Sequence, residues 1–169
     1  MKPNRITLKN IIVIFIFAMI FIMITGCYPF KKLSETEYVS KELGIDFRSG
    51  TVVNSFDDHG GFLGDGTTII KISFDDSSCV EKIKDSEEWC PLPLTENLIE
   101  FLDNVNYDEF DDVCIDSNIK NGYYCFIDRH TESRDSKDDT DLLNRFSINA
   151  TLAIYDTETN ALYYAELDT

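Results

Sequence analysis

The sequence predicts a single α+β domain, built from an antiparallel sheet of about five strands and two or three short helices. Two observations lead to this class. Short runs rich in β-branched and aromatic residues recur between turn-forming residues, and helical patterns lie among them. With 169 residues, the chain is long enough for one domain to bury its core without a metal or disulfides. We place this domain at residues 34–169.

The first expected helix covers about residues 34–43. Ser34 and Glu37 have the spacing of a capping box, Leu33 and Tyr38 that of a hydrophobic staple, and Gly44 provides a stop. A shorter helix is expected within residues 75–88. The clearest helix follows an N-cap threonine, and its apolar residues have helical spacing, as the series Thr95, Leu98, Phe101, Leu102 and Val105 shows.

Five segments have the pattern of strands. Residues 51–56 and 67–74 are expected to form one hairpin, and residues 122–128 a further strand. The last two strands are expected at about 146–154 and 161–167, with a turn at 156–160 between them. In the first of these, apolar residues alternate with smaller or polar ones, which predicts a single buried face formed by Phe146, Ile148, Ala150, Leu152 and Ile154. The polar segment 129–145 is expected to be a mobile loop, at least as far as Asp141.

Residues 1–26 have the layout of a secretory signal peptide. Three cations and no acid in the first ten residues precede fourteen consecutive apolar residues, Ile11 to Ile24. A helix of that length rises about 21 Å, which is short of a hydrocarbon core roughly 30 Å thick. The stretch is therefore better sized for a signal peptide than for a permanent transmembrane span.

The run Ile24-Thr25-Gly26-Cys27 resembles the lipobox of bacterial lipoproteins. The resemblance implies that the Cys27 thiol receives a diacylglyceryl group, that cleavage falls before Cys27, and that residues 27–33 form the lipidated cysteine and a tether. Two acyl chains are enough for stable membrane attachment. The alternative is an ordinary signal peptide or an uncleaved signal anchor with an incidental cysteine, and either one also places the domain outside the cytoplasm.

The formal net charge of −16 restricts the partners of the domain. Loss of Lys2, Arg5 and Lys9 with the signal peptide takes the charge to −19. Nucleic acid is disfavoured as a partner because phosphate backbones are bound through clustered Lys and Arg. An acidic body is also repelled by anionic lipid, so the membrane is expected as a partner only through the lipid anchor.

The loop between the first two strands is the candidate ligand or partner site, because acidic residues and a histidine lie among glycines that permit close backbone approach. Its residues are Asp57, Asp58, His59, Gly60, Gly61, Asp65 and Gly66. The alternative is a long hairpin connection, with His59 solvated or bonded to a backbone carbonyl. A phosphate cradle is excluded, since the loop has neither a G-x-G-x-x-G nor a Lys-Ser/Thr ending.

An enzyme is the less favoured reading. A hydrolase of the Ser-His-Asp or Cys-His type must draw its base from His59 or His130, and neither lies in a G-x-S-x-G or H-E-x-x-H motif. If the domain is catalytic, His59 with Asp58 is the first pair to examine. The acidic clusters at 108–112 and 135–141 do not fit a calcium loop, so we expect solvated acidic surface, and neither a metal nor a cofactor.

The mature domain contains four cysteines, an even number in an exported protein. Cys79, Cys90, Cys114 and Cys125 permit three pairings, and one or two disulfides are as compatible with the sequence as free thiols. Cys125, on a predicted strand, is the candidate for a buried free thiol. No short C-x-x-C spacing suggests zinc.

From about Leu43 onward the chain resembles a set of small uncharacterised bacterial proteins. They share a run like Asp58-His59-Gly60-Gly61-Phe62 with Gly64-Asp65-Gly66-Thr67 after it, a Trp followed by Pro-Leu, and a carboxy-terminal pattern like TLAIYDTETNALYYAELDT. The resemblance implies one coherent folded unit and no catalytic residue. The sequence thus predicts a membrane-anchored extracytoplasmic lipoprotein whose domain is a non-enzymatic binding or interaction module. An envelope-associated hydrolase and a structural, partner-docking lipoprotein are the alternatives.

Overall fold

The computed structural model describes residues 32–60, 64–106 and 113–169, and residues 33–169 form one compact unit. In chain order its elements are α2 (Glu35–Leu43), β1 (Thr51–Asp57), β2 (Gly66–Ser73), α3 (Ser78–Lys84), β3 (Cys90–Pro91), α4 (Glu96–Val105), β4 (Gly122–Asp128), the 3-10 helix η1 (Leu142–Asn144), β5 (Asn149–Asp156) and β6 (Ala161–Asp168). The expected class, a single α+β domain, is confirmed.

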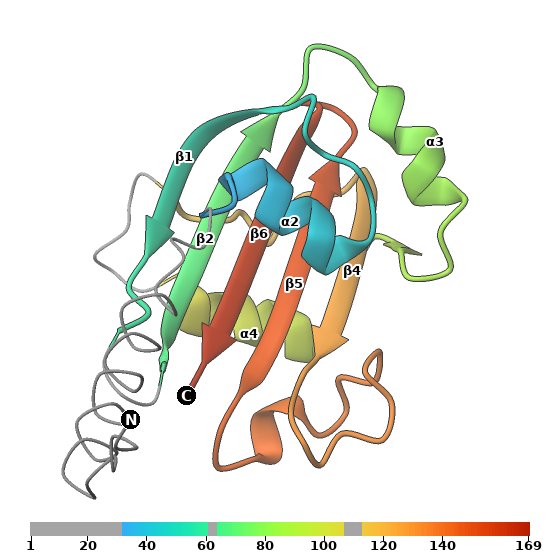
Figure 1. Cartoon of the computed structure of the whole chain (residues 1–169). Coiled ribbons are helices and arrows are strands. Elements are labelled where there is room, and N and C mark those ends of the chain that lie inside the picture. The colour runs from blue at the N-terminus through green and yellow to red at the C-terminus, as the bar shows by residue number, and fades with distance from the viewer. Residues whose placement is uncertain (1–31, 61–63, 107–112) are drawn as a thin grey trace, which may run out of the picture. The chain divides into compact units, whose positions relative to one another are not determined.

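The six strands form one open antiparallel sheet in the order β1-β2-β6-β5-β4-β3 (Figure 1). The expected hairpin is β1–β2, and β2 also pairs with the last strand, β6, over its whole length. The sixth strand, β3, was not expected because it is only two residues long, at the edge beside β4.

Different parts of the chain lie at the two ends of the sheet (Figure 1). Strands β1, β4 and β6 finish at one end, which we call the C-terminal end. At the opposite end, which we call the turn end, β4 begins and β5 turns into β6. Residues far apart in sequence therefore meet at each end, as the pairings Gly66↔Asp168 and Asn149↔Asp168 show at the first and Gly122↔Asp156 at the second.

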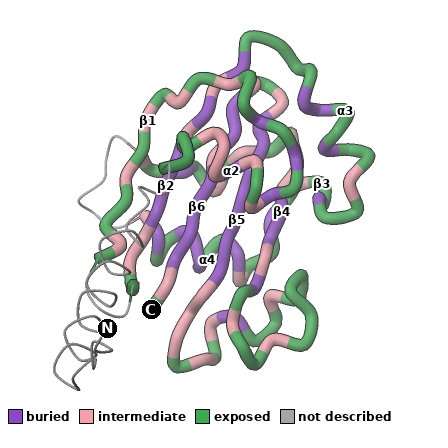
Figure 2. Tube along the Cα trace, viewed as in Figure 1, coloured by how far each residue is buried: buried purple, intermediate pink, exposed green. Residues whose placement is uncertain are grey.

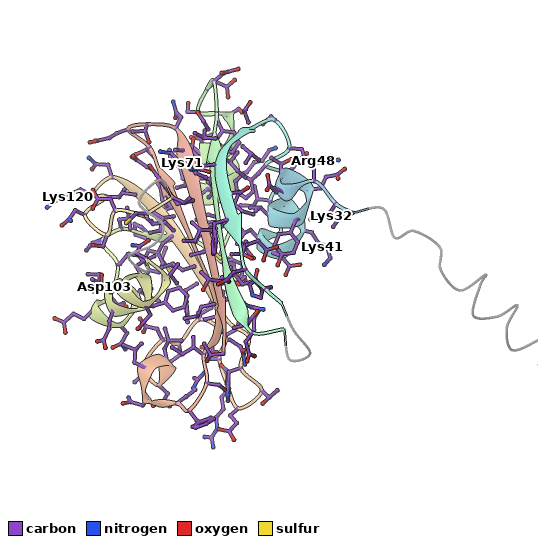
Figure 3. The ribbon with its side chains drawn as sticks, turned by 90° about the vertical axis from the view of Figure 1, so that its left-hand side faces the viewer. Lys32, Lys41, Arg48, Lys71, Asp103 and Lys120 are labelled. Carbon is purple, nitrogen blue, oxygen red and sulfur yellow. The ribbon has the colours of Figure 1, made fainter. Side chains whose placement is uncertain are left out.

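Helices cover both faces of the sheet, with α2 on one face and α4 on the other (Figure 3). Two hydrophobic cores result. One packs α2 and α3 residues against Ala153 and Tyr155 of β5, and the other packs α4 residues against Leu152 and Ile154 of the same strand. The expectation of a single buried face for this strand was therefore wrong, because a sheet covered by helices on both sides buries alternate residues in both directions. Figure 2 shows the buried positions along β5 and β6.

The expected start of this strand was also wrong. β5 begins at Asn149, opposite Asp168, and Phe146 lies in the preceding loop with its side chain fully exposed. The polar segment before it contains turns and η1, and Leu142 of η1 is fully buried beneath the α4 side of the sheet.

The predicted helix ends are confirmed. Ser34 and Glu37 form the capping box of α2, and Gly44 ends that helix at φ 68°. The hydroxyl of Thr95 accepts a hydrogen bond from the Leu98 amide, 3.2 Å away, at the start of α4. Within the described ranges, no helix has the length and apolar character needed to cross a bilayer. Cys27 and the rest of the predicted signal peptide lie outside the described residues.

Candidate functional site

The predicted candidate loop connects β1 to β2 at the C-terminal end of the sheet. Asp57 is the last residue of β1 and Gly66 is the first of β2, while Gly61 lies outside the described residues. The acidic cluster at 108–112 also lies outside them. The remaining loop residues can be placed against the strands that they join.

His59 lies between two carboxylates from different strands. Its Nδ1 is 3.0 Å from Asp57 Oδ1 and 3.1 Å from the Thr68 hydroxyl, and its backbone amide donates to Asp57 at 3.1 Å. Its Nε2 is 3.3 Å from Asp168 Oδ2, an ion-pair distance without the alignment of a hydrogen bond. The imidazole therefore fastens the hairpin loop to the end of β6, and its partners are carboxylates rather than a backbone carbonyl.

The partner of His59 is Asp57, not the neighbouring Asp58 that we expected to examine first. The Asp58 carboxylate accepts a hydrogen bond from the Thr67 amide, and the Asp58 amide donates to the Thr67 carbonyl at 3.1 Å. The backbone amide of Gly60 donates weakly to the Asp65 carbonyl at 3.5 Å. Asp58 thus closes the hairpin, because these bonds join the two chain segments that enter and leave the loop.

Two glycines of this loop, Gly60 and Gly66, differ in the space that a Cβ would find. A Cβ on Gly66 would lie 2.6 Å from His59 Cα and 2.7 Å from its backbone nitrogen, whereas a Cβ on Gly60 would meet only an ordinary contact at 3.6 Å. Contacts under 3.0 Å with backbone atoms cannot be relieved by a rotamer change. Gly66 is therefore the residue that lets the His59 backbone pack onto β2.

Asp168, which faces His59, is also paired with Arg129. Arg129 lies 2.9 Å from Asp168 Oδ1 and 2.8 Å from Glu166 Oε1. Asp57, His59, Asp168, Arg129 and Glu166 form a series in which carboxylates alternate with basic side chains, which we call the His59–Arg129 network. Glu166 and Asp168 take part together because residues two apart on a strand share a face. That spacing was visible in the sequence, whereas the approach of Arg129 was not.

Glu166 connects the His59–Arg129 network to two tyrosines, Tyr38 and Tyr164. Its Oε2 accepts hydrogen bonds from the hydroxyls of Tyr38 at 2.6 Å and Tyr164 at 2.8 Å. Burial first, and then the adjacent Glu166 carboxylate, raise the pKa of both tyrosines well above its ordinary value. Both hydroxyls therefore stay protonated and act as donors, and Tyr38 links α2 to the network.

The electrostatics of Asp57 follow from its contacts. Partial burial acts to raise the pKa of this carboxyl, but the hydrogen bonds from the side chain and backbone of His59, with a further bond from Thr68, outweigh it and lower the pKa. Asp57 is therefore ionised at neutral pH.

The contacts of the network hold neighbouring strands together. A general base must present a ring nitrogen to the hydroxyl or thiol that it activates while its other nitrogen is oriented by a third group. In His59 both nitrogens face carboxylates, and its Thr68 contact is on the same nitrogen as Asp57. An imidazole held in this way ties β1, β2 and β6 together.

The hydrogen bonds of the second histidine, His130, favour a tautomer that cannot take a proton from Ser147. His130 Nδ1 accepts a hydrogen bond from the Glu132 amide at 3.2 Å, and its Nε2 is 3.3 Å from the Ser147 hydroxyl. Because Nδ1 is an acceptor, the proton of the neutral ring is on Nε2, which then donates to Ser147 instead of accepting from it. Ser117 and Lys120 have the S-x-x-K spacing of some serine hydrolases, but they lie outside any helix and share no hydrogen bond within the described part of the chain.

A buried ion pair supports the loop that follows β4. Arg145 NH1 lies 2.6 Å from Asp128 Oδ2, with the Asp128 side chain fully buried and the Arg145 side chain 15% exposed. The pair is close but not aligned as a hydrogen bond. The other Asp128 oxygen accepts from the His130 amide at 3.1 Å. Sequence reasoning missed this pair because seventeen residues separate its members and neither belongs to a motif.

The four cysteines of the described chain are free thiols, with Cys79 and Cys125 buried and Cys90 and Cys114 exposed. Burial raises the pKa of the Cys125 thiol to about 12, so it remains protonated. Cys125 thus occupies the interior strand position expected of a buried free thiol.

No set of three or more His, Cys, Asp or Glu side chains in the described ranges is arranged to hold a metal ion. In the acidic cluster at 135–141, the Asp139 carboxylate accepts a hydrogen bond from the Thr95 hydroxyl, and two other carboxylates turn toward their own loop. Asp135 accepts from the Lys137 amide at 3.0 Å and Asp138 accepts from the Thr140 amide at 2.9 Å. These are turn-stabilising bonds that use oxygens a cation would need.

Comparison with protein-family models, curated proteins and solved structures finds no match. The function must therefore be argued from the sequence and from the geometry described above.

Proposed function

We propose that this protein is an extracytoplasmic lipoprotein, anchored to a membrane by acyl chains on Cys27, whose domain is a non-enzymatic binding module. The apolar stretch followed by Ile24-Thr25-Gly26-Cys27 supports the anchor. The strongly acidic composition supports attachment by lipid rather than by surface charge.

The environment of His59 is the observation that carries the choice of a binding module over an enzyme. The histidine closest to a cluster of acids has both ring nitrogens within ion-pair distance of carboxylates, Nδ1 of Asp57 and Nε2 of Asp168, and these contacts join three strands. A site built in this way rigidifies the end of the sheet, and rigid scaffolds that present loops are typical of binding domains.

The anchor is tested with the full chain in a bacterial host that processes lipoproteins. We expect mass spectrometry to find a diacylated cysteine at the new amino terminus, with residues 1–26 removed and the protein in the membrane fraction. The Cys27→Ser variant should lose acylation and membrane retention. Cys114→Ser, which removes an exposed thiol elsewhere, should leave both unchanged. An unacylated terminus at Met1 would refute the proposed location.

A hydrolase acting on envelope material is the second candidate, favoured only by the 3.3 Å contact between Ser147 and His130. Purified full-length protein should show no turnover in a panel of ester, peptide and glycoside substrates. Turnover that disappears in Ser147→Ala and in His130→Ala, while both variants keep the wild-type unfolding curve, would replace the binding module by the enzyme.

A further inference from the structure

A hollow with a volume of about 500 Å³ lies at the turn end of the sheet. It is lined by residues of α3, of the segment around β3, of the start of β4 and of the β5–β6 turn, so four separate parts of the chain contribute to it. Its size falls within the range of small-molecule sites in proteins. The elements that line it meet at the turn end, opposite the end of the sheet where β1 and β6 finish (Figure 1).

Backbone contacts fix the wall formed by β4. The Leu92 amide donates to the Gly122 carbonyl at 3.1 Å, and the Thr157 amide donates to the Asn121 carbonyl at 3.0 Å. A Cβ on Gly122 would lie 1.9 Å from the Tyr155 carbonyl oxygen, so only glycine allows β4 and β5 to approach there. The hollow is therefore formed by paired backbone and does not depend on side-chain rearrangement.

Three lining residues carry donor groups that the described chain does not use. The Lys120 ammonium, the Ser77 hydroxyl and the Tyr123 hydroxyl make no hydrogen bond or ion pair with any described residue. Lys84, the other cation of the lining, is already bound to Glu81 at 3.0 Å. Lys120 is thus the cation free to meet an anion, with two neutral donors in the same lining.

Val80, Pro91 and Leu92 form an apolar part of the lining, beside the polar residues Asn121 and Thr157. A phosphate group would need more positive charge than one free lysine provides, and is usually held by arginine forks or by successive backbone amides. A carboxylate carries a single charge and needs few donors. An apolar group attached to it would replace water along Val80 and Leu92.

We infer that this hollow, the Lys120 pocket, binds a carboxylate attached to an apolar body, with Lys120 pairing with the carboxylate. The inference rests on the proposed binding module and specifies its ligand chemistry. Free organic acids and the carboxyl termini of peptides share this chemistry. Both are tested with defined probes.

The experiment uses full-length, ¹⁵N-labelled protein in a nonionic detergent. We titrate it with 3-phenylpropionate and, in a second arm, with acetyl-glycyl-phenylalanine. The matched neutral controls are 3-phenylpropionamide and the amide of the peptide. We expect amide shifts centred on Gly122 and Tyr123, with a dissociation constant on the order of 1 mM for the small acid. A peptide acid that binds more tightly than the small acid identifies chain termini as the source, and weaker binding identifies free acids.

Two charge-matched variants locate the contact. Lys120→Gln should weaken binding of the acids about tenfold, with no change for the neutral controls. Lys41→Gln removes the same charge from α2, on the other side of the sheet (Figure 3), and should leave the affinity unchanged. Both lysines are exposed, so neither variant disturbs a core.

Three results would overturn the inference: no shifts at 20-fold excess over the expected dissociation constant (about 20 mM), equal binding of acid and amide, or an affinity insensitive to Lys120→Gln. None of them bears on acylation of Cys27, which is measured separately. If the pocket fails while the anchor is found, the proposed location stands and the ligand chemistry is withdrawn.

Discussion

The two ends of the sheet use their charged side chains in opposite ways. At the C-terminal end, Arg129 is paired with Glu166 and Asp168, and Asp168 also faces His59, whose other carboxylate neighbour is Asp57. At the turn end, Lys120 has no partner among the described residues and lies beside unused hydroxyls. Charges that are fully paired contribute to stability and are costly to remove, whereas unpaired exposed donors contribute little to folding and are available to a ligand.

The largest expected effect is at the buried ion pair behind the network. Replacing Asp128 by alanine leaves Arg145 without its partner in a largely buried position, which should cost about 3 kcal/mol of unfolding free energy. Urea unfolding of residues 33–169, followed by the fluorescence of Trp89, the single and buried tryptophan, measures it. Asp103→Ala, on the exposed side of α4, should stay within about 0.5 kcal/mol of wild type. Equal values for the two variants would contradict the role of the pair.

Replacing one cation at each end of the sheet and measuring the unfolding free energy compares the two ends directly. Arg129→Met should lower the unfolding free energy by about 2 kcal/mol. The substitution leaves the buried carboxylate of Glu166 without its cationic partner and also removes the ion pair with Asp168. Lys120→Met should leave the same unfolding free energy within about 0.5 kcal/mol of wild type, because Lys120 has no partner to lose among the described residues. The contrast between the two ends breaks down if Lys120→Met destabilises the fold as much as Arg129→Met.

Substitutions at Gly66 and Gly60 test how the His59 backbone is positioned. Gly66→Ala should cost about 1.5 kcal/mol, because the new Cβ would have to displace the His59 backbone. It should also shift the NMR signals of the His59 ring. Gly60→Ala meets only an ordinary contact and should change neither quantity. If both substitutions are neutral, the close packing of His59 on β2 is wrong.

The smallest effect is a pH dependence at Asp57. Because its folded pKa lies below the unfolded value of about 3.9, its ionised form stabilises the fold above that pH, and the contribution disappears as pH falls through the folded pKa. Asp57 is largely exposed, so we expect only about 0.5 kcal/mol at pH 7. The difference in unfolding free energy between wild type and Asp57→Asn should shrink below about pH 4. A difference between the two proteins that does not change with pH would contradict this role of Asp57.

Most secondary structure could be predicted from local pattern. The capping box at Ser34, the stop at Gly44 and the apolar stripe of α4 are encoded by residues within a few positions of one another, and the structure confirms them. The start of β5 could not be predicted in the same way. Phe146 fits the alternation of the strand, but pairing with β6 begins only at Asn149, so the apolar ring stays in solvent.

The candidate loop was found correctly as a feature but not in its contacts. Local spacing suggested Asp58 as the partner of His59, whereas hairpin closure uses Asp58 and leaves Asp57 and Asp168 to His59. The approach of Asp168 depends on β2 pairing with β6, a neighbour relation between segments about one hundred residues apart. No pattern in a single sequence reports such a pairing.

The sequence by itself determined the α+β class, the helix caps, the hairpin and the acidic surface, because these depend on neighbouring residues and on composition. It also carries the proposed anchor at Cys27. Only the tertiary structure decided that both faces of β5 are buried, which charges are paired at one end of the sheet, and which donors are left unpaired at the other. Those outcomes depend on strand order, and strand order is set by the packing of the whole chain.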